Sequence, residues 1–389
     1  MASKPWPPES TGNYWIATYS ILEDAGIEAY LVNARHVKGV PGKKTDVCDA
    51  QWLQQLHAAG LLKKSFRPDK DIRPLRYLMR HRADKVGQAS RHLQHMQKVC
   101  NEMNLHIHHV FSDIDGESAQ RIIKAILNGE REPKVLAQLR DHRCRTPVGK
   151  IMEALEGDYR EECLFVLEQD QKSWEQTQQA IAECDAKIAQ LASQICGVTQ
   201  ESVPAAPAVQ RREHKNSLAM PIYQEAWRFY GVDLSQIPGG VGGSTLATLM
   251  SELGTASQIG KAFGNASRFT SWLGLCPDNR ISGGKILKAR TRSVPNRVAG
   301  ALRMAASALR RSPTLLGEYC RRMKGRLGKA EGITATAHKI ARIFYAMITK
   351  GQAYNEEEAF KVTPANKARR LQRLIKQAAA LGHTLVATP

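Results

Sequence analysis

The sequence is short of acidic and aromatic residues, and each shortage excludes a class of protein. Asp and Glu number 37 against 56 Lys and Arg in 389 residues, which gives a formal net charge of +19 and a pI near 9.7. Such an excess of positive charge indicates a polyanionic partner. Aromatic residues make up only 6%, which favours helix-rich packing over a large β-sandwich. The 42% of apolar residues excludes global disorder.

Long apolar runs and paired cysteines are also missing. No stretch approaches the ~20 apolar residues of a membrane-spanning helix, and residues 1–15 lack the apolar run of a signal peptide. The eight cysteines are scattered without a Cys-x-x-Cys pair. This pattern argues against structural zinc and predicts a reduced, cytoplasmic chain with no membrane contact.

Residues 1–68 have the pattern of short alternating helices and strands. Helical spacing runs from Gly12 to Ala25, an apolar run of strand length covers 27–33, and a second helical pattern covers 46–59. Helix, strand and helix in this order predict a fragment of an α/β sheet domain.

A seven-residue periodicity begins near Asp71. Two apolar rows start at Ile72 and Leu75 and extend to residue 110, with Arg82 as the one polar exception, and a matching pattern covers 159–196. These rows predict an antiparallel coiled-coil stalk over 69–198 with a helical tip, and two ordinary bundle helices are the alternative. Segment 151–201 holds eleven acidic and three basic residues, so its helix is expected to face solvent or a basic partner.

The rest of the chain divides into a linker (199–235), a compact helical unit (236–354) and a basic tail (355–389). Segment 280–329 carries fourteen Lys and Arg against one acid, Glu318. Arginines interleaved with Ala, Leu and Met suit amphipathic helices laid on phosphates. The overall prediction is an α/β domain followed by a long antiparallel coiled-coil stalk and a mostly α-helical C-terminal domain.

Carboxylates near the N-terminus form the first candidate site. Asp46 and Asp49 are three residues apart at a predicted helix start, and Glu9 precedes another predicted helix. Each could simply cap its helix. Together they could also hold Mg²⁺, which prefers oxygen ligands and can polarise a phosphodiester.

Two glycine-rich segments form further candidates. Gly240, Gly242 and Gly243 precede a helical pattern, either as a helix-hairpin-helix-like phosphate site or as a structural turn. Ser282 is followed by two glycines, which would leave its hydroxyl exposed to a substrate, although a flexible basic loop is the alternative. The predicted phosphate-binding side chains nearby are those of Lys285, Lys288, Arg290, Arg292 and Arg297. The histidines at 92, 95, 106, 108 and 109 are expected on the surface of the stalk helix rather than on a metal.

Several longer motifs resemble one family, the bacterial DEDD-type insertion-sequence transposases of the IS110 family, over residues 9–352. The resemblance lies in Glu9-Ser-Thr-Gly12, Leu31–His36, Lys44–His57, Ser65–Pro68, Ser282-Gly-Gly-Lys285 and Ile333–Arg342.

The resemblance implies a RuvC-like, RNase H-type domain whose Mg²⁺ cluster includes Glu9, Asp46 and Asp49. It also implies that Ser282 attacks DNA and becomes joined to it, in a coiled-coil-mediated homo-oligomer (dimer or tetramer) guided by a structured RNA. The family's first aspartate lies on a strand before the Glu9 motif, whereas only eight residues, none of them Asp, precede Glu9 here. We therefore expect the domain over 1–68 to be truncated, with an inactive remnant that only binds nucleic acid as the alternative function. A Holliday-junction resolvase is disfavoured because it needs neither the stalk nor the serine segment.

Overall fold

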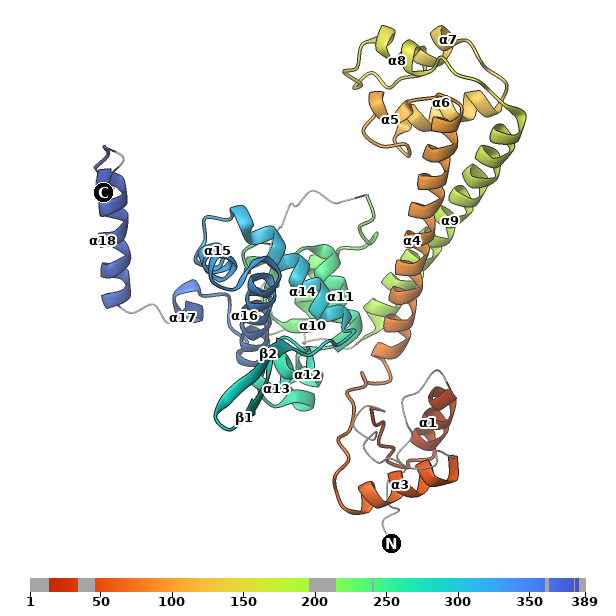
Figure 1. Cartoon of the computed structure of the whole chain (residues 1–389). Helices are drawn as coiled ribbons and strands as arrows, with labels where there is room; N and C mark the ends of the chain where they lie inside the picture. Colours follow the sequence, from red (N-terminus) through yellow and green to blue (C-terminus); the bar gives the residue numbers. More distant parts are fainter. Residues whose placement is uncertain are drawn as a thin grey trace. The chain divides into compact units, whose positions relative to one another are not determined.

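A computed structural model describes residues 14–33, 46–195, 215–239, 241–360, 364–380 and 382–384. The chain separates into two units, Met1–Asp69 and Lys70–Pro389. The described part is mostly helical, and its only sheet is a two-stranded hairpin (Figure 1).

The first unit contains helices α1 (Tyr14–Asp24) and α3 (Asp46–Ala58), close to the predicted helical segments. The predicted strand over 27–33 does not form a regular strand in the described residues. In the described residues Val32 forms only an isolated antiparallel bridge with Lys64, and Ser65 N donates to Leu31 O at 2.7 Å. An apolar run needs neighbouring strands to become a sheet strand, and no strand lies beside it in the described part of this unit. The α/β sheet therefore stays a prediction.

Two long helices, α4 (Ile72–Glu102) and α9 (Glu161–Gln194), form the stalk. They run antiparallel, because Arg82 pairs with Asp185 whereas Arg160, at the start of α9, donates to the carbonyl of Glu102 (Figure 1). Knobs-into-holes packing between the two helices stays a prediction. The predicted apolar rows do supply the buried seam between α4 and α9. Its buried members include Ile72, Leu75, Ala89, Met96, Cys100, Leu167, Ile181 and Ile188.

The first stalk helix ends earlier than its periodicity predicts. Asn104 adopts a left-handed backbone with φ of 60°, which terminates α4, and the amide of Leu105 bonds to Cys100 O at 2.8 Å. Ile107 therefore belongs to a separate short helix, α5 (Ile107–Val110), and packs into the tip. The tip continues with α6 (Glu117–Leu127), α7 (Pro133–Gln138) and α8 (Val148–Ala154) around Ile122, Ile123 and Ile126.

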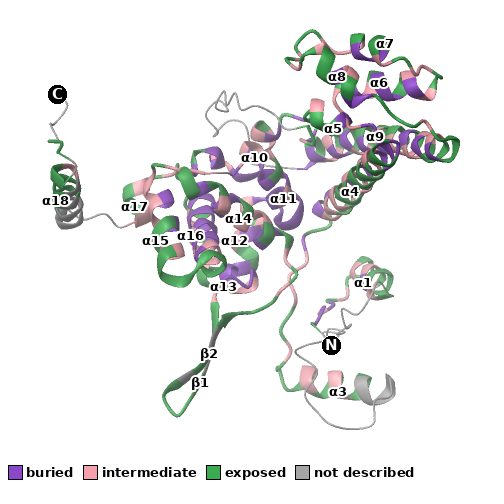
Figure 2. Cartoon of the chain, turned by 45° about the horizontal axis from the view of Figure 1, so that its top comes forward, coloured by how far each residue is buried: buried purple, intermediate pink, exposed green. Residues whose placement is uncertain are grey.

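The C-terminal domain packs its helices around an aromatic core. Phe344 lies 5.5 Å from Tyr230 and 5.9 Å from Phe269 between ring centroids. Figure 2 shows the buried residues concentrated on α11 and α16. The elements are α10 (Ile222–Tyr230), η2 (Leu234–Gln236), α11 (Gly243–Leu253), α12 (Ala256–Phe263), α13 (Ala266–Trp272), β1 (Pro277–Ser282), β2 (Lys285–Thr291), α14 (Arg297–Ala308), η3 (Leu309–Arg311), α15 (Leu315–Leu327), α16 (Lys329–Lys350), α17 (Glu356–Phe360) and α18 (Pro364–Ala380).

Candidate functional site

The serine singled out in the sequence lies at the tip of a β-hairpin, not in an irregular loop. Ser282 ends β1 and pairs with Lys285, the first residue of β2. Gly283 and Gly284 form the two-residue turn with φ of 55° and 73°, a conformation that side-chain-bearing residues rarely adopt. The Ser-Gly-Gly-Lys sequence therefore specifies this turn. Ser282 is exposed, and the hairpin formed by β1 and β2 projects from the helices of the C-terminal domain (Figure 2).

The register of the hairpin places basic side chains beside the serine. Asp278 pairs with Arg290, and a register shift between Arg280 and Ile281 precedes the Ser282–Lys285 pair. Asp278 and Ser282 are four residues apart on β1 and so share a face, and each cross-strand partner lies on the face of the residue it opposes. Lys285 and Arg290 therefore lie on the face of Ser282. Lys285 and Arg290 are exposed, so their charges are available to a ligand.

Two other predicted phosphate contacts lie outside the tip. Arg292 follows β2 and donates from Nη2 to Ser271 O at 2.5 Å and to Ser271 Oγ at 3.1 Å, which ties the hairpin base to α13. Arg297 begins α14 and helps to lower the pKa of Arg76, whose burial is the main cause of that shift. Arg297 therefore lies near the base of the stalk. The side chain of Lys288 lies outside the described residues.

The glycine-rich segment leads into α11 as predicted. Gly242 is the residue before the helix and Gly243 its first residue, while Gly240 lies outside the described residues. The neighbouring Gly239 is required by packing, because a Cβ at this position would lie 2.0 Å from a methyl carbon of Leu309. Most of α11 is buried, so only its first turn is accessible to a phosphate.

The predicted metal-holding carboxylates are placed only by backbone. Asp46 and Asp49 fall in the first turn of α3, about one helical turn apart, and nothing further is described of their side chains. Glu9 lies outside the described residues. Within the described ranges, no cluster of three or more His, Cys, Asp or Glu side chains could hold a metal ion.

The sequence predicted the three histidines of the tip on the stalk helix, but the structure places them at the separate short helix α5. His106 precedes α5 and stacks on His109 with ring centroids 5.0 Å apart, and His108 lies 4.1 Å from His109. His92 and His95 do lie on α4, where both face Asp170 at Nδ1–Oδ1 distances of 2.9 Å and 3.7 Å.

The candidate residues predicted from the sequence did not include two features: a basic surface on α15 and a cavity of mixed charge at the stalk tip. On α15, Arg321, Arg322 and Arg326 are exposed, with the Arg322 guanidinium 5.6 Å from the ring centre of Tyr319. The segment 280–329 was the signal that could have identified them.

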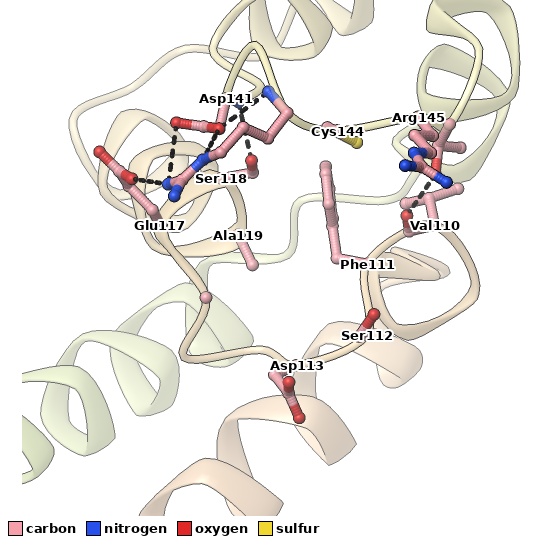
Figure 3. Close-up of a pocket in the computed structure, with 13 residues that line it drawn as sticks. Val110, Phe111, Ser112, Asp113, Glu117, Ser118, Ala119, Asp141, Cys144 and Arg145 are labelled. Carbon is pink, nitrogen blue, oxygen red and sulfur yellow. Dashed lines mark hydrogen bonds and ion pairs between the residues drawn. The ribbon is translucent and has the colours of Figure 1, made fainter. Parts of the chain in front are cut away.

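The second feature is a cavity of about 460 Å³ at the stalk tip, whose charged lining residues are Asp113, Glu117, Asp141, Arg143 and Arg145 (Figure 3). Arg143 pairs with two carboxylates, with Nη2 3.2 Å from Glu117 Oε2 and Nε 2.8 Å from Asp141 Oδ1. The hydrogen bonds from Arg143 hold the pKa of Asp141 well below its usual range. Arg145 lines the same cavity and is exposed.

Searching the described helices for a membrane span identified none that is long and apolar enough. A search of curated proteins gave no match. Two family models match the chain. The DEDD transposases of IS110 type, described as "Transposase", match residues 3–104, and "Transposase IS116/IS110/IS902 family" matches residues 233–320. The first match covers α1, α3 and the whole of α4, and the second includes the serine hairpin. Together the two matches support an IS110-family transposase, a class of DNA-binding, DNA-processing enzymes.

Proposed function

We propose that this chain is an insertion-sequence transposase that cuts and rejoins DNA by attack of Ser282 on a phosphodiester. The observation that carries the proposal is the exposed hairpin tip, where Ser282 faces Lys285 inside the segment matched by the second transposase family. A nucleophile at such a tip can reach a phosphate of the DNA backbone without any movement of the helical core.

The proposed step exchanges one phosphate ester for another. The Ser282 Oγ–P bond forms, the bond from phosphorus to one deoxyribose oxygen breaks, and that oxygen leaves with a proton while the serine proton passes to solvent. Lys285 and Arg290 share the face of Ser282, so their charges would stabilise the negative charge that develops on the phosphate. Rejoining is the reverse attack by a deoxyribose hydroxyl on the serine ester.

The carboxylates of Glu9, Asp46 and Asp49 are the proposed Mg²⁺ ligands. The placement of Asp46 and Asp49 one turn apart in α3, together with the oxygen donors that Mg²⁺ prefers, fits such a role. A bound metal would neutralise charge on the phosphodiester. In this proposal the carboxylates hold the metal, while Ser282 forms the covalent bond.

Nucleic acid is the proposed partner of the basic surface on α15. Arg321, Arg322 and Arg326 on α15 are exposed cations, as phosphate contacts require. A structured guide RNA and a homo-oligomer in which the carboxylates of one copy serve the serine of another belong to the same proposal, and both rest on the family resemblance.

The serine assignment is tested with Ser282→Ala in the full chain. Strand cleavage and the covalent protein–DNA adduct should disappear, by at least about 10³-fold, because the attacking atom is removed. Binding to the same DNA, measured by fluorescence anisotropy at fixed salt, should change less than about threefold. Ser267→Ala, at an exposed serine of α13, is the matched control and should cleave normally.

Cleavage by Ser282→Ala would remove the serine from the mechanism. A wild-type chain that binds DNA but neither cleaves nor forms the adduct, with Mg²⁺ and RNA supplied, would instead favour the inactive nucleic-acid-binding protein.

A further inference from the structure

The C-terminal helix α18 has a polar, basic composition and an apolar stripe that no described residue covers. Leu371, Leu374 and Ile375 recur at helical spacing, and their exposed fractions are 55%, 42% and 47%. The helix carries five basic residues and no acidic one over 364–380. A basic amphipathic helix with an open apolar stripe is suited to an acidic surface that also offers apolar side chains.

Such a surface lies where α9 begins at the stalk tip. Segment 153–162 holds five acidic residues and one basic residue, Arg160. Phe165 and Val166 follow on α9 with exposed fractions of 62% and 44%, and Glu161 and Glu162 precede them on the same outward face. An exposed Phe and Val beside unburied carboxylates form a patch with the opposite charge and the same apolar character as α18.

The carboxylates of this patch are only partly neutralised. Arg160 is shared between Asp158, at 3.4 Å, and Glu162, at 3.9 Å. Two acids farther along α9 each pair with a cation of their own, since Glu168 pairs with Lys172 at the edge of the patch and Glu175 pairs with Lys124. A cavity of about 490 Å³, lined in part by Glu156 and Asp158, adjoins the start of the helix. The patch therefore keeps net negative charge for a basic partner.

We infer that α18 of one copy of this chain docks on the acidic patch, residues 153–169, of a second copy. Two such contacts related by a two-fold axis would form a reciprocal exchange of C-terminal tails. The reach of the tail favours a second copy. Three residues, 361–363, join α18 to α17, and α17 is held on α15 by the bond from Leu315 N to Glu356 Oε1 at 2.7 Å. That tether spans at most about 14 Å.

The patch of the same chain is farther away along the stalk. The C-terminal domain contacts α4 through Glu252 and Arg80, whereas the acidic patch adjoins Glu102 at the other end of α4. The 22 residues between Arg80 and Glu102 correspond to about 33 Å of helix. Leu374 lies ten residues into α18, about 15 Å along the helix, so with the tether it reaches at most about 29 Å from α17. This is shorter than the length of α4 that separates the C-terminal domain from the acidic patch of the same chain, and a second copy removes the requirement.

The decisive experiment is photo-crosslinking from position 374 in the nuclease-treated full chain. Leu374 is replaced by a benzophenone amino acid, and equal amounts of ¹⁴N- and ¹⁵N-labelled protein are mixed, so that mass spectrometry separates crosslinks within a copy from those between copies. Mixed-isotope crosslinks to residues 153–169 are expected. Crosslinks within one copy, crosslinks to another surface, or crosslinks only to added nucleic acid would each overturn the inference.

Charge exchange supplies an independent measurement. Glu161→Lys with Glu162→Lys should weaken self-association in sedimentation by at least about tenfold, because like charges then face each other. Adding Arg369→Glu and Arg370→Glu should restore most of the loss. The matched control is Glu183→Lys, at an exposed position farther along α9, which should leave self-association unchanged. Equal weakening by the control, or no restoration, would contradict the contact.

Discussion

At the scale of single residues, the buried arginine in the apolar rows of α4 has a clear structural role. Arg82 is 8% exposed and pairs with the buried Asp185, with Nη2–Oδ2 at 3.0 Å. The same guanidinium donates to the carbonyls of Asn216 and Ser217 at 3.2 Å and 3.0 Å. A buried charge is tolerated when it is paired and fully hydrogen-bonded. The bonds to Asn216 and Ser217 show that Arg82 interrupts the apolar row at the point where residues 216 and 217 contact the stalk.

The histidine of the C-terminal motif makes the stability of this domain depend on pH. Burial lowers the pKa of His338 below its ordinary value of 6.5, and the charges of Arg342 and Lys339 lower it further. The unfolded chain then binds more protons than the folded chain below pH 6.5, so the free energy of unfolding should fall as the pH falls through this value. One such group contributes a slope of at most about 1.4 kcal/mol per pH unit.

Urea unfolding between pH 7.5 and 5.5 measures this contribution by difference. His338→Gln should unfold with a shallower pH dependence than the wild type. His81→Gln, at an exposed position of α4, should leave the slope unchanged. Parallel curves for His338→Gln and the wild type would show that His338 does not contribute.

At the scale of helices and strands, the sequence predicted long periodic elements well and short ones poorly. The heptads of 72–102 and 161–194 fix helices because each apolar position recurs many times and is buried against its partner. The run at 27–33 has no such repetition, and strand formation depends on neighbours that periodicity does not report. The break at Asn104 depends on one backbone angle, which no apolar pattern encodes.

The candidate site shows the same limit. The turn at Gly283 and Gly284 could have been predicted as a hairpin from two consecutive glycines, but the flanking residues do not alternate between apolar and polar types. The two strands are largely solvent-exposed, with Ile281 62% and Leu287 70% exposed. Because neither face of the hairpin is buried, its sequence does not need the alternation of apolar and polar residues that identifies a strand. The basic character of the segment was predicted, whereas the face shared by Ser282 and Lys285 follows only from the register.

The contact between α15 and α16 predicts opposite effects for two glycine substitutions. A Cβ at Gly332 of α16 would lie 2.6 Å from the Lys324 backbone of α15, so Gly332→Ala should force the helices apart and destabilise by about 1–3 kcal/mol. A Cβ at Gly325 would meet open space on α15, and Gly325→Ala should stabilise by roughly 0.5–1 kcal/mol.

Thermal and urea unfolding of the two single variants distinguish packing from helix propensity. Both substitutions increase helix propensity equally, so stabilisation by Gly332→Ala as well would show that α15 and α16 are not in close contact there.

At the scale of the second unit, a partly buried ionic cluster joins the stalk to the C-terminal domain. Glu252 of α11, 5% exposed, accepts from Arg80 Nε and Nη2 at 2.8 Å each and lies 2.7 Å from Arg76 Nε. Burial lowers the pKa of Arg76, with the Glu252 carboxylate opposing the shift. One carboxylate thus holds two cations from the base of α4, and the domain that carries Ser282 is attached to the stalk through this contact.

Removing that carboxylate charge should loosen the attachment. Glu252→Gln leaves two neighbouring arginines without their shared anion, and breaking a buried pair costs about 3–5 kcal/mol. Because Arg76 and Arg80 keep contact with water, a loss of about 2–3 kcal/mol is expected here. Hydrogen exchange should accelerate in α11 and in the first two turns of α4, while the amides of α6 at the tip keep their protection. Glu168→Gln, which breaks an exposed pair with Lys172 on α9, is the control and should change stability by less than about 0.5 kcal/mol. Unchanged exchange in α11, or equal acceleration in α6, would mean that Glu252 does not join the two parts.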